Sequence, residues 1–173
     1  MTTPPRDPHR DADGEALALA RTILEGARDA VLSVLDAGGW PMVSRIALQA
    51  DPPGKPLAML SGLALHTAAL RADPRAALLL DAPAEPAARG MALTRARLSL
   101  QVEAQPVPAE EDEALRHAWV RRDPKAAVYA RLPDFRLWRM QPRAGLLNAG
   151  FGRAYRLGAA ELACLADSEK PGS

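Results

Sequence analysis

The residues of "LSGLALHTAAL" (60–70) include polar side chains at a position where they could bind an anion. An apolar run ends at Ser61, and a helical pattern begins near His66 and Thr67. The first N–H groups of a helix have no intrahelical partner and attract anions, and hydroxyl groups can add further donors. The same side chains could instead cap the helix. The segment therefore predicts either a capped helix start or a phosphate site.

Arg45 is a second candidate anion ligand, because it stands in the middle of an otherwise apolar run. Its planar guanidinium matches the geometry of a phosphate, and a rigid strand would hold it in place. An arginine at the rim of a sheet, with its charge in water, would show the same pattern. Arg97 and Gln101 share the polar face of an alternating segment. Such a face either contacts solvent or lines a ligand.

Other common catalytic and metal-binding patterns are missing from the sequence. His9, His66 and His117 have no second histidine or cysteine at ligand spacing, so we predict no metal site. The single cysteine, Cys164, excludes an intramolecular disulfide and a multi-cysteine zinc site. The sequence has no G-x-S-x-G elbow, no P-loop and no dinucleotide-binding glycine motif. It therefore disfavours a serine hydrolase and the common nucleotide-binding folds.

Length and composition indicate one globular domain. The chain has 173 residues, of which 48% are hydrophobic and 25% charged, and this is ordinary for a protein with a packed core. A net charge of +1 provides no bulk field to attract nucleic acid or an acidic membrane. The sequence shows no signal-peptide pattern and no apolar run near the roughly 20 residues of a membrane span. We therefore expect a cytoplasmic protein with no nucleic-acid or membrane partner.

Hydrophobic spacing predicts the elements of the first half of the chain. Apolar residues recur at helical spacing over 14–28. Two apolar runs flank Gly38 and Gly39, which favours a hairpin because glycine adopts positive φ without strain. In the second run Ser44 and Arg45 belong to opposite faces. The next expected elements are a third strand near 57–60, a helix over 66–73 and a fourth strand over 76–82.

The second half begins with the clearest alternation in the sequence, "RARLSLQVEA" (95–104), which indicates a half-buried antiparallel strand. A loop is expected over 82–90. The remaining predicted elements are helices over 109–122 and 125–132, and strands over 135–140 and 144–157. Trp119 and Trp138 are expected in the core rather than stacked on a ligand, and His117 at the surface.

The order of these elements predicts the fold class. The strands are joined mostly by hairpins and do not alternate regularly with helices, so we expect an antiparallel barrel decorated by helices. The protein is therefore expected to be mainly β with helices (α+β). Residues 1–13 are polar and rich in proline, and we expect a flexible N-terminal tail there. The predicted domain covers 14–160, and 161–173 is expected to form a C-terminal tail.

Several segments occur in a familiar order and spacing, namely "ARTILEGARDAVLSVLDAGGWPMVSRIAL", "LSGLALHTAALRADPRAALLL", "RARLSLQVEA", "DPKAAVYARLPDFRLWRM" and "GFGRAYRL". Over residues 15–157 the sequence resembles the pyridoxamine 5′-phosphate oxidase-like FMN-binding split barrels, in particular the subgroup related to haem-utilisation proteins. The resemblance implies a six-stranded antiparallel split β-barrel. It also implies a homodimer with two equivalent cofactor sites at the subunit interface.

The resemblance also assigns residues to the cofactor site. It places Ser44 and Arg45 on the second strand, and Ser61, His66 and Thr67 in the strand-to-helix turn, near the FMN phosphate. Arg97 and Gln101 lie on a strand that often lines the flavin ring or the phosphate in such proteins. Phe151 and Arg153 lie near a C-terminal strand that can approach the partner's site.

The leading functional hypothesis is an FMN-binding flavoprotein that acts as an oxidoreductase on an unknown substrate. If the protein is an enzyme, the flavin would transfer hydride or electrons while the protein supplies position and electrostatics. The sequence identifies no catalytic acid or base. The second hypothesis is a haem- or flavin-binding carrier or sensor without turnover. The third is a dimer that binds no cofactor and serves as an interaction module.

Overall fold

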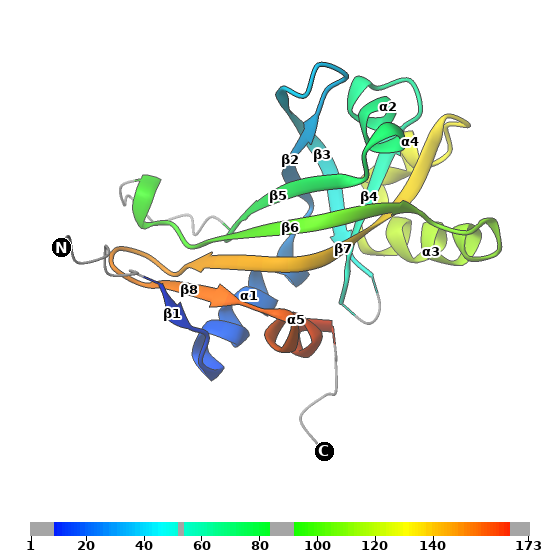
Figure 1. Cartoon of the computed structure of the whole chain (residues 1–173). Coiled ribbons are helices and arrows are strands. Elements are labelled where there is room, and N and C mark those ends of the chain that lie inside the picture. Colours follow the sequence, from blue (N-terminus) through cyan, green and yellow to red (C-terminus); the bar gives the residue numbers. More distant parts are fainter. Residues whose placement is uncertain (1–8, 52–53, 84–91, 167–173) are drawn as a thin grey trace.

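Six antiparallel strands close into a barrel in a computed structural model of the chain, which describes residues 9–51, 54–83 and 92–166 (Figure 1). The strands follow each other around the barrel in the order β7-β4-β3-β2-β5-β6, and β6 pairs again with β7. They are β2 (Asp29–Leu35), β3 (Pro41–Ala50), β4 (Pro56–Ser61), β5 (Arg75–Asp81), β6 (Arg97–Pro106) and β7 (Phe135–Asn148). The predicted α+β class and six-stranded split barrel are therefore confirmed.

Helices cover the barrel on several sides (Figure 1). They are α1 (Gly14–Gly26), α2 (Leu65–Ala72), α3 (Ala109–Arg122), α4 (Ala127–Ala130) and α5 (Ala159–Ala166), with short 3₁₀ turns at Ala92–Thr94 and Pro124–Ala126. Two short strands extend the sheet beyond the barrel. β8 (Ala154–Leu157) pairs with the end of β7, and β1 (Arg10–Asp11) pairs with β8 in parallel. None of the helices in the described ranges is long and apolar enough to cross a membrane.

The barrel interior forms the main hydrophobic core, because alternate side chains of each strand point inward. Leu32, Leu48 and Leu98 are fully buried there, and α1 adds Ala20 and Ile23 to the same cluster. Burial of such a continuous leucine-rich interior is the main stabilising contribution in a domain of this size. The barrel is therefore a packed scaffold that holds its outer face and its turns in place.

A second core cluster lies outside the barrel, where α3 and α4 cover β4 and β7. It contains Leu57 and Met59 of β4, Leu137 of β7 and Trp119 of α3. Trp119 is 2% exposed, and Trp138, inside the barrel, is 3% exposed. Both tryptophans are core residues, as the sequence predicted.

The domain extends beyond its predicted limits. Arg10 and Asp11, expected in a flexible tail, pair with β8. Residues 161–166, expected in a C-terminal tail, belong to α5, and Leu162 and Leu165 are buried against β7 and α1. The rest of the two predicted tails, 1–8 and 167–173, lies outside the described residues, as does most of the predicted loop 82–90.

The predicted hairpin joins β2 and β3. Gly39 has a φ of 80°, which glycine adopts without strain. The Asp36 carboxylate accepts hydrogen bonds from the N–H groups of Gly38 and Trp40, both at 2.8 Å. This turn fixes the register that places Arg45 opposite Val31 and Ser44 opposite Leu32.

Candidate functional site

The turn between β4 and α2 is held by the hydroxyl groups that the sequence identified. Ser61 Oγ donates to Asp134 Oδ2 at 2.6 Å and accepts from the Leu63 N–H at 3.2 Å. Thr67, only 1% exposed, donates from its hydroxyl to the Ser61 carbonyl at 2.7 Å. The Gly62 N–H donates to the Asp134 carbonyl at 2.7 Å. The structure therefore brings Ser61 and Thr67 together and adds Asp134, which the sequence analysis missed.

The capping alternative for this turn is wrong. The N-cap residue of α2 is Ala64, and no side chain of the described residues makes a capping hydrogen bond there. The helix begins at Leu65, one residue before its predicted start. The Thr67 hydroxyl bonds backward to a carbonyl instead of accepting from a helix N–H, and Ser61 accepts from an N–H before the helix. The first amide groups of α2 are thus left without a side-chain cap.

His66 lies in the first turn of α2 and is half-buried. Desolvation by burial lowers the pKa of His66 below its ordinary value of 6.5. The imidazole is therefore neutral at pH 7 and offers a single N–H donor rather than a positive charge. A neutral imidazole can donate a hydrogen bond to an anion, but it cannot form an ion pair with it.

Arg45 and Ser61 lie on the outer face where β3 and β4 separate. The last pair of these strands joins Ala47 and Met59, and both of these residues contact the outer core cluster. Arg45 lies two residues before Ala47, and Ser61 lies two residues after Met59. Because successive side chains of a strand alternate between its two faces, Arg45 and Ser61 point outward as Ala47 and Met59 do. Ser44 belongs to the inward face, opposite Leu32, and is half-buried.

Arg45 is already ion-paired with Asp29 across β2 and β3. The two side chains are 68% and 54% exposed, so this pair is a surface salt bridge of small energetic value. Arg45 also lines an outer-face pocket of about 260 Å³ together with Arg28 and Arg95. Arg28 and Arg95 were not predicted as site residues. Arg28 follows the end of α1, and Arg95 precedes β6. The folded chain brings both of them to the same pocket as Arg45, and no local sequence pattern indicates this.

Arg97 and Gln101 lie on the outer face of β6, which β2 and β5 separate from β3. Arg97 lies opposite Asp81 of β5 in the strand register. Its guanidinium donates to the carbonyls of Leu93 and Arg95, each at 3.4 Å. Gln101 is exposed between β5 and β7. Within one chain, these two candidates lie apart from the β4–α2 turn.

A strip of the outer face that is apolar except for Ser99, called the apolar strip below, connects the two groups of candidates. Strand register places Val31 beside Leu79, Leu79 beside Ser99, and Ser99 beside Leu146. Leu79 is 36% exposed and Leu146 is 38% exposed. Large apolar side chains grouped on an open sheet face are typical of a protein interface.

The turn between β7 and β8 carries the two C-terminal candidates. Phe151 is 89% exposed. A hydrogen bond with Tyr155 raises the pKa of Arg153, which is charged at all ordinary pH values. Neither residue lies on the outer barrel face that carries Arg45. Within the described ranges, no three histidine, cysteine, aspartate or glutamate residues form a group that could hold a metal ion.

The closed barrel and its strand-to-helix turn define a split-barrel protein. Residues 17–148 match the family model for pyridoxamine 5′-phosphate oxidase, so the chain belongs to that family. The non-canonical heme oxygenase HOZ, chloroplastic, of Arabidopsis thaliana is 30% identical over 143 residues, which are 82% of this chain and 42% of that protein. These matches confirm the resemblance predicted from the sequence.

Solved structures show the same fold. One solved structure is 54% identical to this chain, with a TM-score of 0.81. The match covers 88% of this chain and 98% of the chain in that structure. A heme binding protein from Mycobacterium smegmatis is 27% identical, with a TM-score of 0.77, and the match covers 88% of this chain and 62% of that one. This chain therefore spans less than half of the Arabidopsis protein and less than two thirds of the mycobacterial one.

Proposed function

We propose that this protein binds FMN on the outer face of the barrel, where β3 and β4 separate. Arg45 and the β4–α2 turn carry this proposal, because Arg45 presents a guanidinium and the turn leaves the start of α2 without a side-chain cap, on the same side of the diverging strands. Family membership supports FMN as the cofactor. Bound flavin would supply hydride or electron transfer, and an oxidoreductase of unknown substrate is the activity we infer.

The residues of the turn fit a phosphate group. Thr67 and Asp134 fix the backbone around Ser61, so the turn is rigid before a ligand arrives. The uncapped first turn of α2 and the neutral imidazole of His66 provide donors, and Arg45 provides the positive charge. Ser44 supports β3 from the inner face. We assign direct phosphate contact to Arg45, to His66 and to the first amide groups of α2, with Ser61 and Thr67 shaping the turn, and we assign Arg97 and Gln101 to the flavin ring.

A homodimer would complete the site. Arg97 and Gln101 lie apart from the β4–α2 turn within one chain, but a second copy on the outer face would bring another set of these residues near it. The apolar strip with Leu79 and Leu146 supplies the surface that such a copy would bury. Phe151 and Arg153 would then approach the partner's site from the β7–β8 turn.

Titration of the purified protein with FMN and with riboflavin tests the proposal. Riboflavin has the same ring system without the phosphate, so it serves as the matched control. FMN fluorescence should be quenched at a saturable site, and FMN should bind at least about tenfold more tightly than riboflavin because one charge-assisted hydrogen bond is lost. Equal affinity for both compounds would contradict phosphate recognition by the turn.

Haem is the second candidate cofactor, for a carrier or sensor without turnover. The names of the Arabidopsis and mycobacterial relatives support this alternative. The same preparation can be titrated with haemin while the Soret absorbance is recorded. Saturable haemin binding together with no FMN binding would favour the haem alternative, and failure of both would favour an interaction module.

A further inference from the structure

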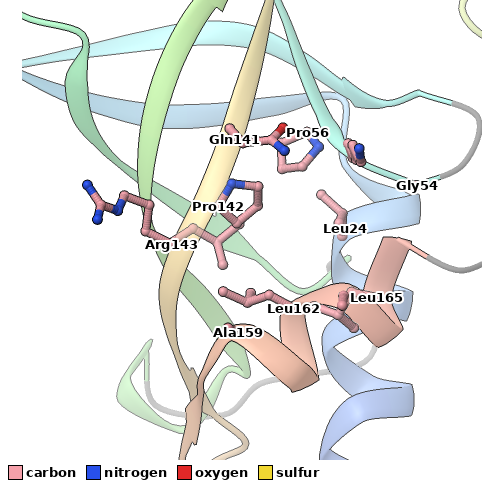
Figure 2. Close-up of a pocket in the computed structure, with 12 residues that line it drawn as sticks. Leu24, Gly54, Pro56, Gln141, Pro142, Arg143, Ala159, Leu162 and Leu165 are labelled. Atoms are coloured by element: carbon pink, nitrogen blue, oxygen red, sulfur yellow. The ribbon is translucent and has the colours of Figure 1, made fainter.

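A cavity of about 600 Å³ lies where β7 passes from β4 to β8 (Figure 2). Pairing of β4 with β7 ends at Leu57 and Arg139, and pairing of β7 with β8 begins at Gly145. On this edge, residues 140–144 therefore have no partner among the described strands. A bulge in the same stretch leaves Arg143 unpaired with β6 as well. The cavity thus lies beside a stretch of β7 that lacks a strand partner, and it opens to solvent where the exposed residues Gln141, Arg143, Ala159 and Ala163 line it.

The floor of the cavity is apolar. Leu24 comes from α1, Leu162 and Leu165 come from α5, and Leu100 comes from β6. Each of these leucines is at most 7% exposed. Figure 2 shows Leu24 and Leu162 reaching from two different helices toward Pro142 of β7. Such a floor favours a hydrocarbon body over a polar ligand.

The rim of the cavity is positive. Lys55, Gln141 and Arg143 are the polar side chains among the described residues that line it, and these include no aspartate or glutamate. Neither Lys55 nor Arg143 forms an ion pair with any residue that the structure describes. In Figure 2 the Arg143 side chain points away from the leucines. Lys55, which adjoins Pro56 at the end of the cavity, is therefore the cation available to a ligand's head group.

We propose that this cavity binds an amphipathic monocarboxylate with an extended hydrocarbon chain. The chain lies on the leucine floor, and the carboxylate pairs with the flexible ammonium group of Lys55. The volume is within the usual range for small-molecule sites, roughly 300–1,000 Å³. The lining shares no residue with the assigned FMN site, so this inference does not depend on the proposed function.

Calorimetric titration of the full chain with decanoate tests the proposal, with 1-decanol as the uncharged control. Decanoate should bind saturably, and Lys55→Gln should weaken it by about tenfold or more without changing decanol binding, because only the charged hydrogen bond is lost. Lys125→Gln is the matched control, because Lys125 is exposed and does not line the cavity. Ala163→Phe should abolish binding of both compounds by filling the cavity.

Ala163 is exposed on α5, so its replacement should not unfold the protein, and Ala163→Ser controls for substitution at this position. The proposal is overturned if decanoate shows no saturable binding, or if Ala163→Phe leaves its affinity unchanged. It is also overturned if Lys55→Gln affects decanoate no more than Lys125→Gln does. A change from a larger to a smaller species on Ala163→Phe, measured by sedimentation, would also overturn the proposal, because a second copy of the chain would then occupy the cavity.

Discussion

Arg45 provides the charge in the assigned phosphate site, and its present partner is the exposed carboxylate of Asp29. Because a surface ion pair contributes little, a phosphate can replace Asp29 at small cost. Arg45→Ala should therefore weaken FMN binding by about 1.5–3 kcal/mol, the range for a charge-assisted hydrogen bond. Fluorescence titration measures the change. Arg121→Ala, which removes an exposed arginine from α3, should leave the affinity unchanged. Equal affinities for wild type and Arg45→Ala would remove Arg45 from the site.

His66 makes the stability of the fold depend on pH. Its pKa is lowered in the folded protein by burial, whereas the unfolded chain has the ordinary value of 6.5. Below that value the unfolded chain binds more protons than the folded protein, so stability should decrease as the pH falls from about 7 through 6.5 toward the folded-state pKa. Thermal unfolding measured between about pH 5 and 8, where histidine changes its charge, gives this slope. His66→Gln should reduce the slope, and equal slopes in wild type and His66→Gln would contradict this effect of burial.

The sequence identified the polar residues of the turn around Ser61, but it did not identify Asp134, which accepts the hydrogen bond from Ser61. Ser61, His66 and Thr67 are polar residues at an apolar strand end, and this contrast identifies them. Asp134 is 73 residues further along the chain. No local spacing relates Asp134 to Ser61, and only the pairing of β4 with the start of β7 brings them together. Arg28 and Arg95 were missed for the same reason.

The β4–α2 turn depends on Asp134, which accepts hydrogen bonds through both its side chain and its carbonyl. Asp134→Ala should lower the free energy of unfolding by about 1–2 kcal/mol, because the Ser61 hydroxyl loses its acceptor in a partly buried site. It should also weaken FMN binding, because the turn is no longer held. Urea denaturation and FMN titration measure the two effects.

Asp134→Asn is the conservative control, because its amide oxygen still accepts from Ser61. It should retain most of the stability and most of the FMN affinity. If Asp134→Ala lowers stability but binds FMN as tightly as wild type, Asp134 is structural and the turn does not contact the cofactor.

Local patterns predicted most elements but not α5 or the continuity of β7. Helix spacing in α1 and α3, and the glycine turn between β2 and β3, are local properties that a single segment carries. Residues 159–166 form a short helix that is stabilised by burial of Leu162 and Leu165 against β7 and α1. The sequence around Pro142 and Arg143 divides β7 into two apparent strands, whereas the structure joins them through a bulge. Both differences arise from tertiary packing.

At the scale of the whole molecule, the proposed cofactor site requires two copies of the chain. Leu79→Glu should convert a dimer into a monomer, because it adds a charge to the apolar strip at a position that is 36% exposed in one chain. Light scattering with size-exclusion chromatography measures the mass, and FMN affinity should fall together with dimerisation. Val128→Glu, at an 81% exposed position on α4, is the matched control. A wild-type protein that is monomeric at all concentrations would contradict the shared site.

The barrel itself followed from the sequence, but the relation between the two groups of candidate residues did not. Hairpin connections and alternating strands indicate an antiparallel barrel, and the order of motifs identified its type. The distance between Gln101 and the β4–α2 turn depends on how six strands close, which no pair of neighbouring elements specifies. The resemblance implied a homodimer, but the separation of the two groups within one chain, which supports the proposal of a shared site, is visible only in the complete fold.

The most direct test of the central claim is the absorbance spectrum of the protein as purified, with the mass of any small molecule released on denaturation. We predict flavin bands at about 370 and 450 nm, which are set by the chemistry of the cofactor, and a released mass equal to that of FMN. A haem Soret band without flavin bands, or a colourless protein that also fails to bind added FMN, would contradict the claim.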